Sequence, residues 1–180
     1  MITVVSGSNR PNNFTSIFAE YAFNYLKTET EGQCQYLDLL QIDPISLCST
    51  RESQEQLQPE LQILKAQYFL PVNKFWFFVP EYNGSIPGIF KMFLDVLSLH
   101  DLGATFRGKK ACITGTATGR AGNLRGMDHL ADILNHLDIT VMPNKLPVSS
   151  IHKLIDAQRI LHDEATAGLL KKQARTFLNF

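Results

Sequence analysis

Residues 2–25 read ITVVSGSNRPNNFTSIFAEYAFNY, and this stretch contains the unit that decides the fold. Its first five residues are mostly apolar or β-branched, which is typical of a short buried strand. Residues 7–13 are turn formers and predict a loop. After the loop, apolar side chains recur at helical spacing and form one stripe, which predicts an amphipathic helix. The stripe consists of Phe14, Ile17, Phe18, Tyr21, Ala22 and Tyr25.

The same alternation of strand and helix continues along the chain. Further strands are expected at residues 33–40, 74–79, 110–114 and 139–142, and helices at 59–68, 89–97, 124–137 and 163–178. Residues 43–58 are polar and read as a long surface connection, while residues 149–162 fit either a loop or a helix. Alternating strands and helices form parallel sheets through right-handed crossovers. We therefore expect an α/β protein with a five-stranded, doubly wound parallel sheet between two helical layers.

Composition narrows the class of protein. The 180 residues carry 17 Lys and Arg against 17 Asp and Glu, and 44% of them are hydrophobic. This length and core fraction predict a single domain over residues 1–180. The neutral charge balance lacks the basic signature of a nucleic-acid-binding protein. No apolar run approaches the roughly 20 residues of a membrane helix, so we expect neither nucleic acid nor membrane as a partner.

Cysteine usage and the first residues bear on the cellular compartment. Cys34, Cys48 and Cys112 are odd in number and far apart, which suits reduced thiols better than a disulfide framework. The N-terminal residues lack the basic region and cleavage pattern of a signal peptide. These features predict a cytoplasmic protein.

The loop after the first predicted strand has the composition of an anion site. The N-terminus of the following helix offers backbone N–H groups and a partial positive charge. Ser8, Asn13, Thr15 and Ser16 add neutral donors, and Arg10 adds a charged fork suited to phosphate. The loop equally fits an ordinary turn in which Asn13 caps the helix. It contains neither the dinucleotide fingerprint nor the triphosphatase loop motif.

The loops after the third and fourth predicted strands carry the other candidate groups. Residues 80–88 read PEYNGSIPG, in which two prolines and two glycines could present backbone groups to the edge of a flat heterocycle. This segment also fits a tight turn in which Tyr82 merely packs, and we interpret Glu81 as structural. The fourth strand leads into a glycine-rich loop between Gly115 and Gly126. Five flanking cations fit either attraction of a ligand's phosphate or a solvated rim: Arg107, Lys109, Lys110, Arg120 and Arg125.

Residues 7–10 (GSNR) and 80–88, followed by Lys91 and Asp95, resemble the NADPH-dependent FMN reductase family. The resemblance covers about residues 2–143. It implies the flavodoxin-like fold, with strand order 2-1-3-4-5, and FMN as cofactor with NADPH or NADH as electron donor. The ligand that the five flanking cations could attract would then be the extra phosphate of NADPH.

The resemblance also implies roles for particular residues. Ser8 and Arg10 match the family's phosphate-loop serine and arginine, while Asn13 and Thr15 stand where many members have Ser and Asn. Thr116 lies in the loop expected to border the ring's other edge. The segment expected to line the isoalloxazine ring comprises Pro80, Glu81, Tyr82, Asn83, Gly84 and Ser85.

The implied function is an oxidoreductase that moves hydride from NAD(P)H to FMN and then to a flavin, quinone, azo or similar acceptor by a ping-pong mechanism. We expect no catalytic side chain, since the cofactor carries the chemistry, and no metal site.

Residues 89–97 are apolar nearly all round, so this helix is either deeply buried or packed on a second subunit. Family members commonly dimerise through this region, which predicts a homodimer or a dimer of dimers. The alternative is a non-enzymatic flavodoxin-like electron carrier or partner-binding module.

Overall fold

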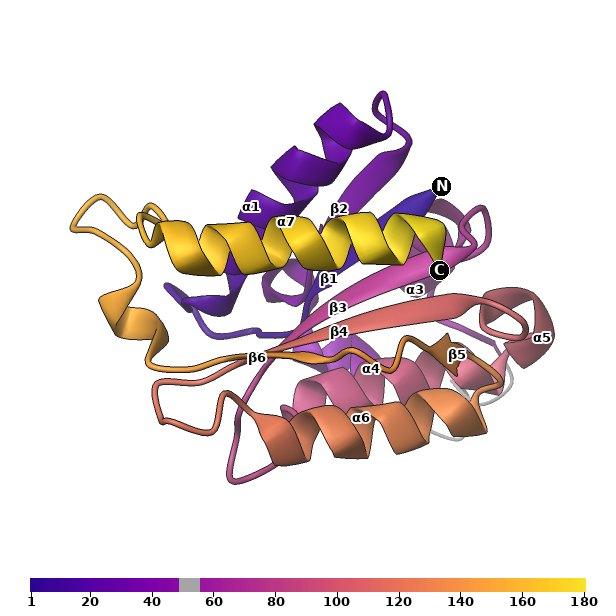
Figure 1. Cartoon of the computed structure of the whole chain (residues 1–180). Helices are drawn as coiled ribbons and strands as arrows, with labels where there is room; N and C mark the ends of the chain where they lie inside the picture. The colour runs from indigo at the N-terminus through magenta and orange to yellow at the C-terminus, as the bar shows by residue number, and fades with distance from the viewer. Residues whose placement is uncertain (49–55) are drawn as a thin grey trace.

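The computed structural model describes residues 1–48 and 56–180 and is built around one parallel sheet (Figure 1). Its strands pair in the order β2-β1-β3-β4-β5, which is the order that the resemblance implies. In register, Val4 of β1 lies between Tyr36 of β2 and Trp76 of β3. The first four strands are β1 (Ile2–Ser6), β2 (Cys34–Asp38), β3 (Lys74–Pro80) and β4 (Lys110–Thr116).

The strand position beyond β4 is divided between two short segments. β5 (Thr140–Val141) pairs with the start of β4, and β6 (Leu146–Val148) pairs with its end, both in parallel. The expected strand at 139–142 is therefore shorter than predicted, and β6 was not predicted. Pro143 lies between β5 and β6. It has no backbone N–H to donate to a neighbouring strand, which fits the break between the two segments. Because Val148 of β6 pairs with Thr116, β4 has a neighbouring strand up to its last residue.

Helices cover both faces of the sheet, which gives the three expected layers. α1 and α7 lie on one face, and α4 and α6 lie on the other (Figure 1). The 149–162 segment, which fitted either a loop or a helix, is largely a loop with one 3-10 turn at Ile151–Lys153. The longer helices are α1 (Thr15–Glu29), α3 (Pro59–Tyr68), α4 (Gly88–Leu99), α6 (Leu124–His136) and α7 (Glu164–Asn179); shorter turns are α5 (Leu102–Thr105), η1 (Leu39–Gln41) and η2 (Pro44–Leu47).

Two hydrophobic clusters, one on each face, hold the layers together. Side chains alternate along a strand, so consecutive residues of β3 enter different clusters. Phe75 and Phe77 pack with α3, α4 and α6, whereas Trp76 and Phe78 pack with α1 and α7. All four aromatic side chains are fully buried, as is Cys112 on β4. Burial on both faces explains why β3 is a continuous apolar run rather than an alternating one.

Two predictions about segments outside the strands need adjustment. The 43–58 connection is not only a surface segment, because Leu47 and Leu57 are buried in the core; residues 49–55 lie outside the described residues. In α4, the apolar side chains are mostly buried within the single chain, which accounts for much of its all-round apolarity. Met92 and Leu99 of α4 are 38% and 51% exposed. The homodimer stays a prediction.

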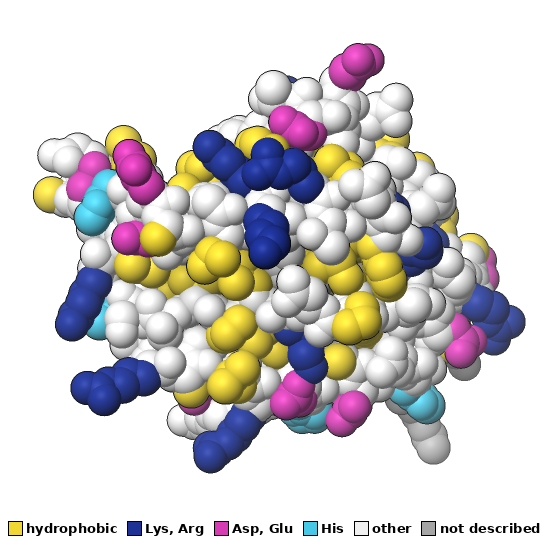
Figure 2. Space-filling model, viewed as in Figure 1, with side chains coloured by type: hydrophobic (Ala, Val, Ile, Leu, Met, Phe, Trp, Pro, Cys, Tyr) yellow, Lys and Arg dark blue, Asp and Glu magenta, His cyan; other side chains and the backbone are white. Residues whose placement is uncertain are grey.

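Figure 2 views the molecule from the α7 side and shows hydrophobic side chains gathered in a band alongside that helix. Leu146 of β6 and Phe180, which follows α7, are partly buried against the cluster beneath. Within the described residues, no helix is both long enough and apolar enough to cross a membrane.

Candidate functional site

A pocket of about 300 Å³ opens at the carboxyl ends of β1, β3 and β4. This is where ligands bind in doubly wound sheets. Most of the predicted site residues line it, whereas Asn83, Gly84 and Ser85 do not. The lining consists of Ser8, Arg10, Pro11, Asn12, Asn13, Phe14, Thr15, Pro80, Glu81, Tyr82, Thr116, Ala117, Thr118 and Ile151.

The first loop is held in shape by its own polar groups. Asn13 Oδ1 accepts a hydrogen bond from the backbone N–H of Ser16 (2.9 Å), and Asn13 Nδ2 donates to the carbonyl of Arg10 (2.9 Å). Asn13 therefore caps the first turn of α1, as the simpler interpretation predicts, and it also lines the pocket. Ser8 is buried, and its Oγ accepts from the backbone N–H of Arg10 at 3.3 Å.

A buried hydroxyl pair joins the start of α1 to the end of β4. Thr15 Oγ1 and Thr116 Oγ1 lie 2.8 Å apart, and both side chains are almost completely buried. The backbone N–H of Glu81 donates to the carbonyl of Thr116 at 3.0 Å. These bonds link all three predicted loops at one point, although 101 residues separate the two threonines.

The second loop contains a tight two-residue turn. Tyr82 and Ser85 exchange both backbone hydrogen bonds, at 2.9 and 3.1 Å. Asn83 and Gly84 at the tip both have positive φ, 51° and 77°, which an Asn-Gly pair adopts readily. Ser85 Oγ lies 2.6 Å from Nδ1 of His129 on α6. Of this segment, only Pro80, Glu81 and Tyr82 line the pocket.

Arg10 and Tyr82 connect the first and second loops across the pocket. The Arg10 guanidinium carbon lies 4.0 Å from the centre of the Tyr82 ring, and Tyr82 Oη lies 3.3 Å from Ser8 Oγ. Stacking of a cation on a ring face is attractive. Among the described residues that line the pocket, Glu81 is the only acid. Together with the N-terminus of α1, the lining favours an anion.

The five flanking cations do not gather at this site. Arg107, Lys109 and Lys110 lie at the opposite end of β4, so the idea that they face an NADPH phosphate here is wrong. Arg107 pairs with Asp138 at 3.0 Å, and the Lys110 ammonium donates to the carbonyl of Phe180. Arg120 and Arg125 follow the carboxyl end of β4 and remain near the site.

The third loop packs closely against the end of β4 and is bonded to the end of β3. A side chain on Gly115 would place Cβ only 2.4 Å from the carbonyl oxygen of Gly122. Asn123 is buried, has a positive φ of 66°, and donates from Nδ2 to the carbonyl of Val79 at 2.9 Å. The loop is thereby attached to the end of β3, beside the second loop.

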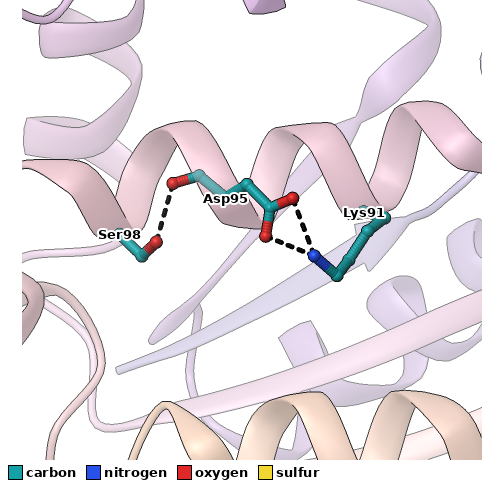
Figure 3. Close-up of polar contacts among 3 residues, drawn as sticks. All are labelled: Lys91, Asp95 and Ser98. Atoms are coloured by element: carbon teal, nitrogen blue, oxygen red, sulfur yellow. Dashed lines mark hydrogen bonds and ion pairs between the residues drawn. The ribbon is translucent and has the colours of Figure 1, made fainter. Parts of the chain in front are cut away.

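Lys91 and Asp95, which contribute to the resemblance, lie on α4 outside the pocket (Figure 3). Lys91 Nζ donates to both Asp95 carboxylate oxygens, at 2.6 and 2.7 Å, and Ser98 Oγ donates to the backbone carbonyl of Asp95 at 2.7 Å. The pair is one helical turn apart and exposed. Such surface pairs contribute little to stability, and neither residue lines the pocket.

The neighbouring end of β2 holds a buried acidic group. Asp38 is 7% exposed, and its carboxylate accepts from the backbone N–H of Leu40 (3.0 Å) and from the Tyr36 hydroxyl (3.3 Å). Burial raises the pKa of Asp38, and burial together with the Asp38 charge raises the pKa of Tyr36. Within residues 1–48 and 56–180, no three His, Cys, Asp or Glu side chains gather as a metal site requires.

Sequence reasoning missed some residues at the site. Thr118 and Ile151 line the pocket, and the backbone N–H of Ile151 donates to the carbonyl of Ala117 at 3.2 Å. Ile151 comes from the segment whose structure the pattern left open. An isolated apolar residue such as Ile151 carries no sequence signal that it lines a pocket.

Several known proteins are similar to this chain in sequence or in fold. A family model described as NADPH-dependent FMN reductase matches residues 1–153. An NAD(P)H-dependent FMN reductase of Pseudomonas aeruginosa is 35% identical over 98 residues, which cover 54% of this chain and 52% of that protein. The chain thus spans about half the length of this relative. A 2-hydroxy-1,4-benzoquinone reductase of a Burkholderia species is 26% identical over 179 residues, covering 99% and 92%.

One solved structure extends the likeness in fold over nearly the whole chain. FerB, a flavoenzyme NAD(P)H:(acceptor) oxidoreductase from Paracoccus denitrificans, superposes with a TM-score of 0.75. The superposition covers 99% of this chain and 94% of that one, at 21% identity. At this identity the likeness concerns the fold alone.

Proposed function

Because this chain belongs to the NADPH-dependent FMN reductase family, we propose that it is an FMN-dependent oxidoreductase that takes hydride from NADPH or NADH and reduces a small-molecule acceptor. The observation that carries this proposal is the convergence of the first and second loops on one pocket. There Ser8 and Arg10 meet Tyr82 at the carboxyl edge of the sheet.

The pocket's donors suit the phosphate of FMN. Ser8 and Thr15 provide hydroxyls, and Arg10 provides the fixed charge, beside the N-terminus of a 15-residue helix. A phosphate binds well where a helix N-terminus and an arginine fork meet. The side chain of Asn13 is used inside the loop, so we propose that it shapes this site as well as lining it.

The second loop suits the flavin ring. We propose that Pro80, Glu81 and Tyr82 lie along the ring, and that the Asn83–Ser85 turn holds them in place from behind. Thr116 would border the opposite edge. FMN, when bound, would supply hydride chemistry: a hydride taken from the nucleotide would go on to the acceptor together with a proton from solvent, so no protein acid is needed at the hydride-accepting atom. If one ring face stays open, donor and acceptor must use it in turn, which gives a ping-pong mechanism.

We propose a quinone-type acceptor first, with flavins and azo compounds as further candidates. The relative that aligns along nearly the whole chain is named a 2-hydroxy-1,4-benzoquinone reductase. A flat acceptor of this kind could stack where the nicotinamide stacks. We further propose one domain over residues 1–180, in the cytoplasm, where the three free cysteines would stay reduced.

A homodimer or a dimer of dimers is part of the proposal. The exposed apolar side chains of Met92 and Leu99 on α4 support an interface there. Sedimentation equilibrium measures the solution mass directly. A mass of one chain over the working concentration range would remove this part of the proposal.

The first test is the visible absorption spectrum of the purified protein with added FMN, followed by NADPH or NADH without oxygen. We expect flavin bands that shift on binding and bleach on reduction, with turnover when a quinone is added. Binding without bleaching by either nucleotide would instead identify an electron carrier. If no FMN binds, the chain is a partner-binding module and the proposed function is wrong.

A further inference from the structure

A small hairpin near the C-terminal end of the chain reaches the first loop. Asp156 and Ile160 close it, with the Asp156 N–H donating to the Ile160 carbonyl (2.9 Å) and the Ile160 N–H to Asp156 Oδ1 (2.8 Å). Ile155 and Leu161 form a bridge at its base, and Leu161 is buried against the α1 and α7 cluster. The hairpin follows residue 153, where the match to the family model ends.

Arg159, at the tip of this hairpin, binds the backbone of the first loop. Its Nη2 donates to the carbonyls of Asn12 (3.1 Å) and Asn13 (2.7 Å). Its guanidinium carbon lies 5.4 Å from the centre of the Phe14 ring. One charged group therefore contacts three consecutive residues of the pocket lining, across about 146 positions of sequence.

The contact determines the direction of peptide groups in the loop. In a trans peptide the C=O and the following N–H point in opposite directions. Holding the Asn12 and Asn13 carbonyls toward Arg159 therefore turns the N–H groups of Asn13 and Phe14 away from it. Asn12 also has a positive φ of 56°, a conformation that asparagine adopts more readily than most other residues.

We propose that Arg159 is a positioning residue that holds the first loop, residues 8–15, in the shape that receives the phosphate of FMN. The inference rests on the proposed function. Arg159 is not among the residues that line the pocket, so it acts through the loop rather than by touching the phosphate. Nη2 carries two N–H groups, so it can donate one to each carbonyl, and hydrogen bonds from a charged donor are stronger than neutral ones.

The test compares FMN with riboflavin, which has the same ring without the phosphate. Arg159→Met removes the guanidinium but keeps much of the apolar stem. Arg159→Gly also removes it and relieves the positive φ of 63° at this position, so the hairpin turn should stay intact. Arg175→Met, at an exposed position on α7, is the control for losing one charge. Dissociation constants come from quenching of flavin fluorescence.

We expect both Arg159 variants to bind FMN about tenfold more weakly, the equivalent of one net hydrogen bond, while riboflavin binding changes little. The Arg175 variant should match the unsubstituted protein. If FMN affinity is unchanged in both Arg159 variants, the inference is wrong and the proposed function stands. Equal weakening of FMN and riboflavin would also overturn it, because a general structural role would then explain the effect.

A further result concerns the proposed function itself. If the unsubstituted protein binds FMN no more tightly than riboflavin, the phosphate is not held at the first loop. The proposed phosphate site and the role of Arg159 would then both be wrong. The unsubstituted protein therefore separates failure of the proposed site from failure of the Arg159 inference.

Discussion

Lys109 is a buried cation far from the pocket, and its titration should contribute to the pH dependence of stability in the alkaline range. Its side chain is 8% exposed, its ammonium donates to the carbonyl of Phe69, and it lies 5.6 Å from the centre of the Phe75 ring. Burial, followed by the nearby charge of Lys65, lowers the pKa of Lys109 from its ordinary 10.5 to about 8. Burial lowers the pKa of Lys65 as well.

The sign of the effect follows from proton binding. Between about pH 8 and about pH 10.5 the unfolded chain keeps the Lys109 proton while the folded protein loses it, so stability rises with pH. A pKa difference of about 2.5 corresponds to about 3.4 kcal/mol. Solvent that reaches the ammonium screens part of this, so we expect a gain of about 2 kcal/mol in the free energy of unfolding.

Lys109→Met removes the titrating group while keeping a long apolar side chain. Urea unfolding at several pH values can follow the fluorescence of Trp76, the only tryptophan, which is fully buried. Burial raises the pKa of the Cys112 thiol above its ordinary 9.0, which lowers stability as pH rises above about 9. The expected result is therefore a difference: between about pH 8 and about pH 10.5 the unsubstituted protein should gain about 2 kcal/mol in the free energy of unfolding relative to the Lys109 variant. Lys172→Met, at an exposed position on α7, should follow the unsubstituted protein. Parallel profiles for the unsubstituted protein and the Lys109 variant would refute the reasoning.

Two further predictions concern the phosphate site and the core. Arg10→Ala should weaken FMN binding by a charge-assisted contact, on the order of 1.5–3 kcal/mol; an unchanged dissociation constant in a fluorescence titration would contradict the phosphate assignment. Thr114→Val should lower the free energy of unfolding by about 2–4 kcal/mol, because two buried polar groups lose their partner. Thr114 Oγ1 accepts from Trp76 Nε1 (2.8 Å) and donates to Gln173 Oε1 (2.7 Å), and an unchanged urea midpoint would show that this network contributes nothing.

Much of the architecture could be predicted because its signals are local. The run from Phe75 to Val79 is buried on both faces, so its strand shows in the sequence as an unbroken apolar stretch. The stripe beginning at Phe14 likewise predicts α1, which the structure places at Thr15–Glu29. The split of the fifth strand position was less accessible, because the pairing of β6 with β4 depends on the sheet being assembled.

The flanking cations show how a local pattern can mislead. Lys109 immediately precedes the stretch expected to form a strand and Lys110 begins it, whereas the loops of interest follow the strands. The predicted direction of that strand already placed both lysines at the far end of the sheet. Their charge alone suggested a phosphate partner, whereas the structure uses Lys109 to bind a buried carbonyl.

The sequence by itself determined the succession of strands and helices along the chain and the two loops whose residues carry the family resemblance, and it offered a tight turn within residues 80–88 as one alternative. These features depend on neighbours within a few positions, where side-chain period and backbone preference act directly. Only the tertiary structure decided that Thr15 meets Thr116, that Arg10 lies on Tyr82, and that Arg159 binds the first loop. Such contacts join residues far apart in the chain, and no local pattern specifies them because they exist only once the sheet has brought its carboxyl ends to one edge.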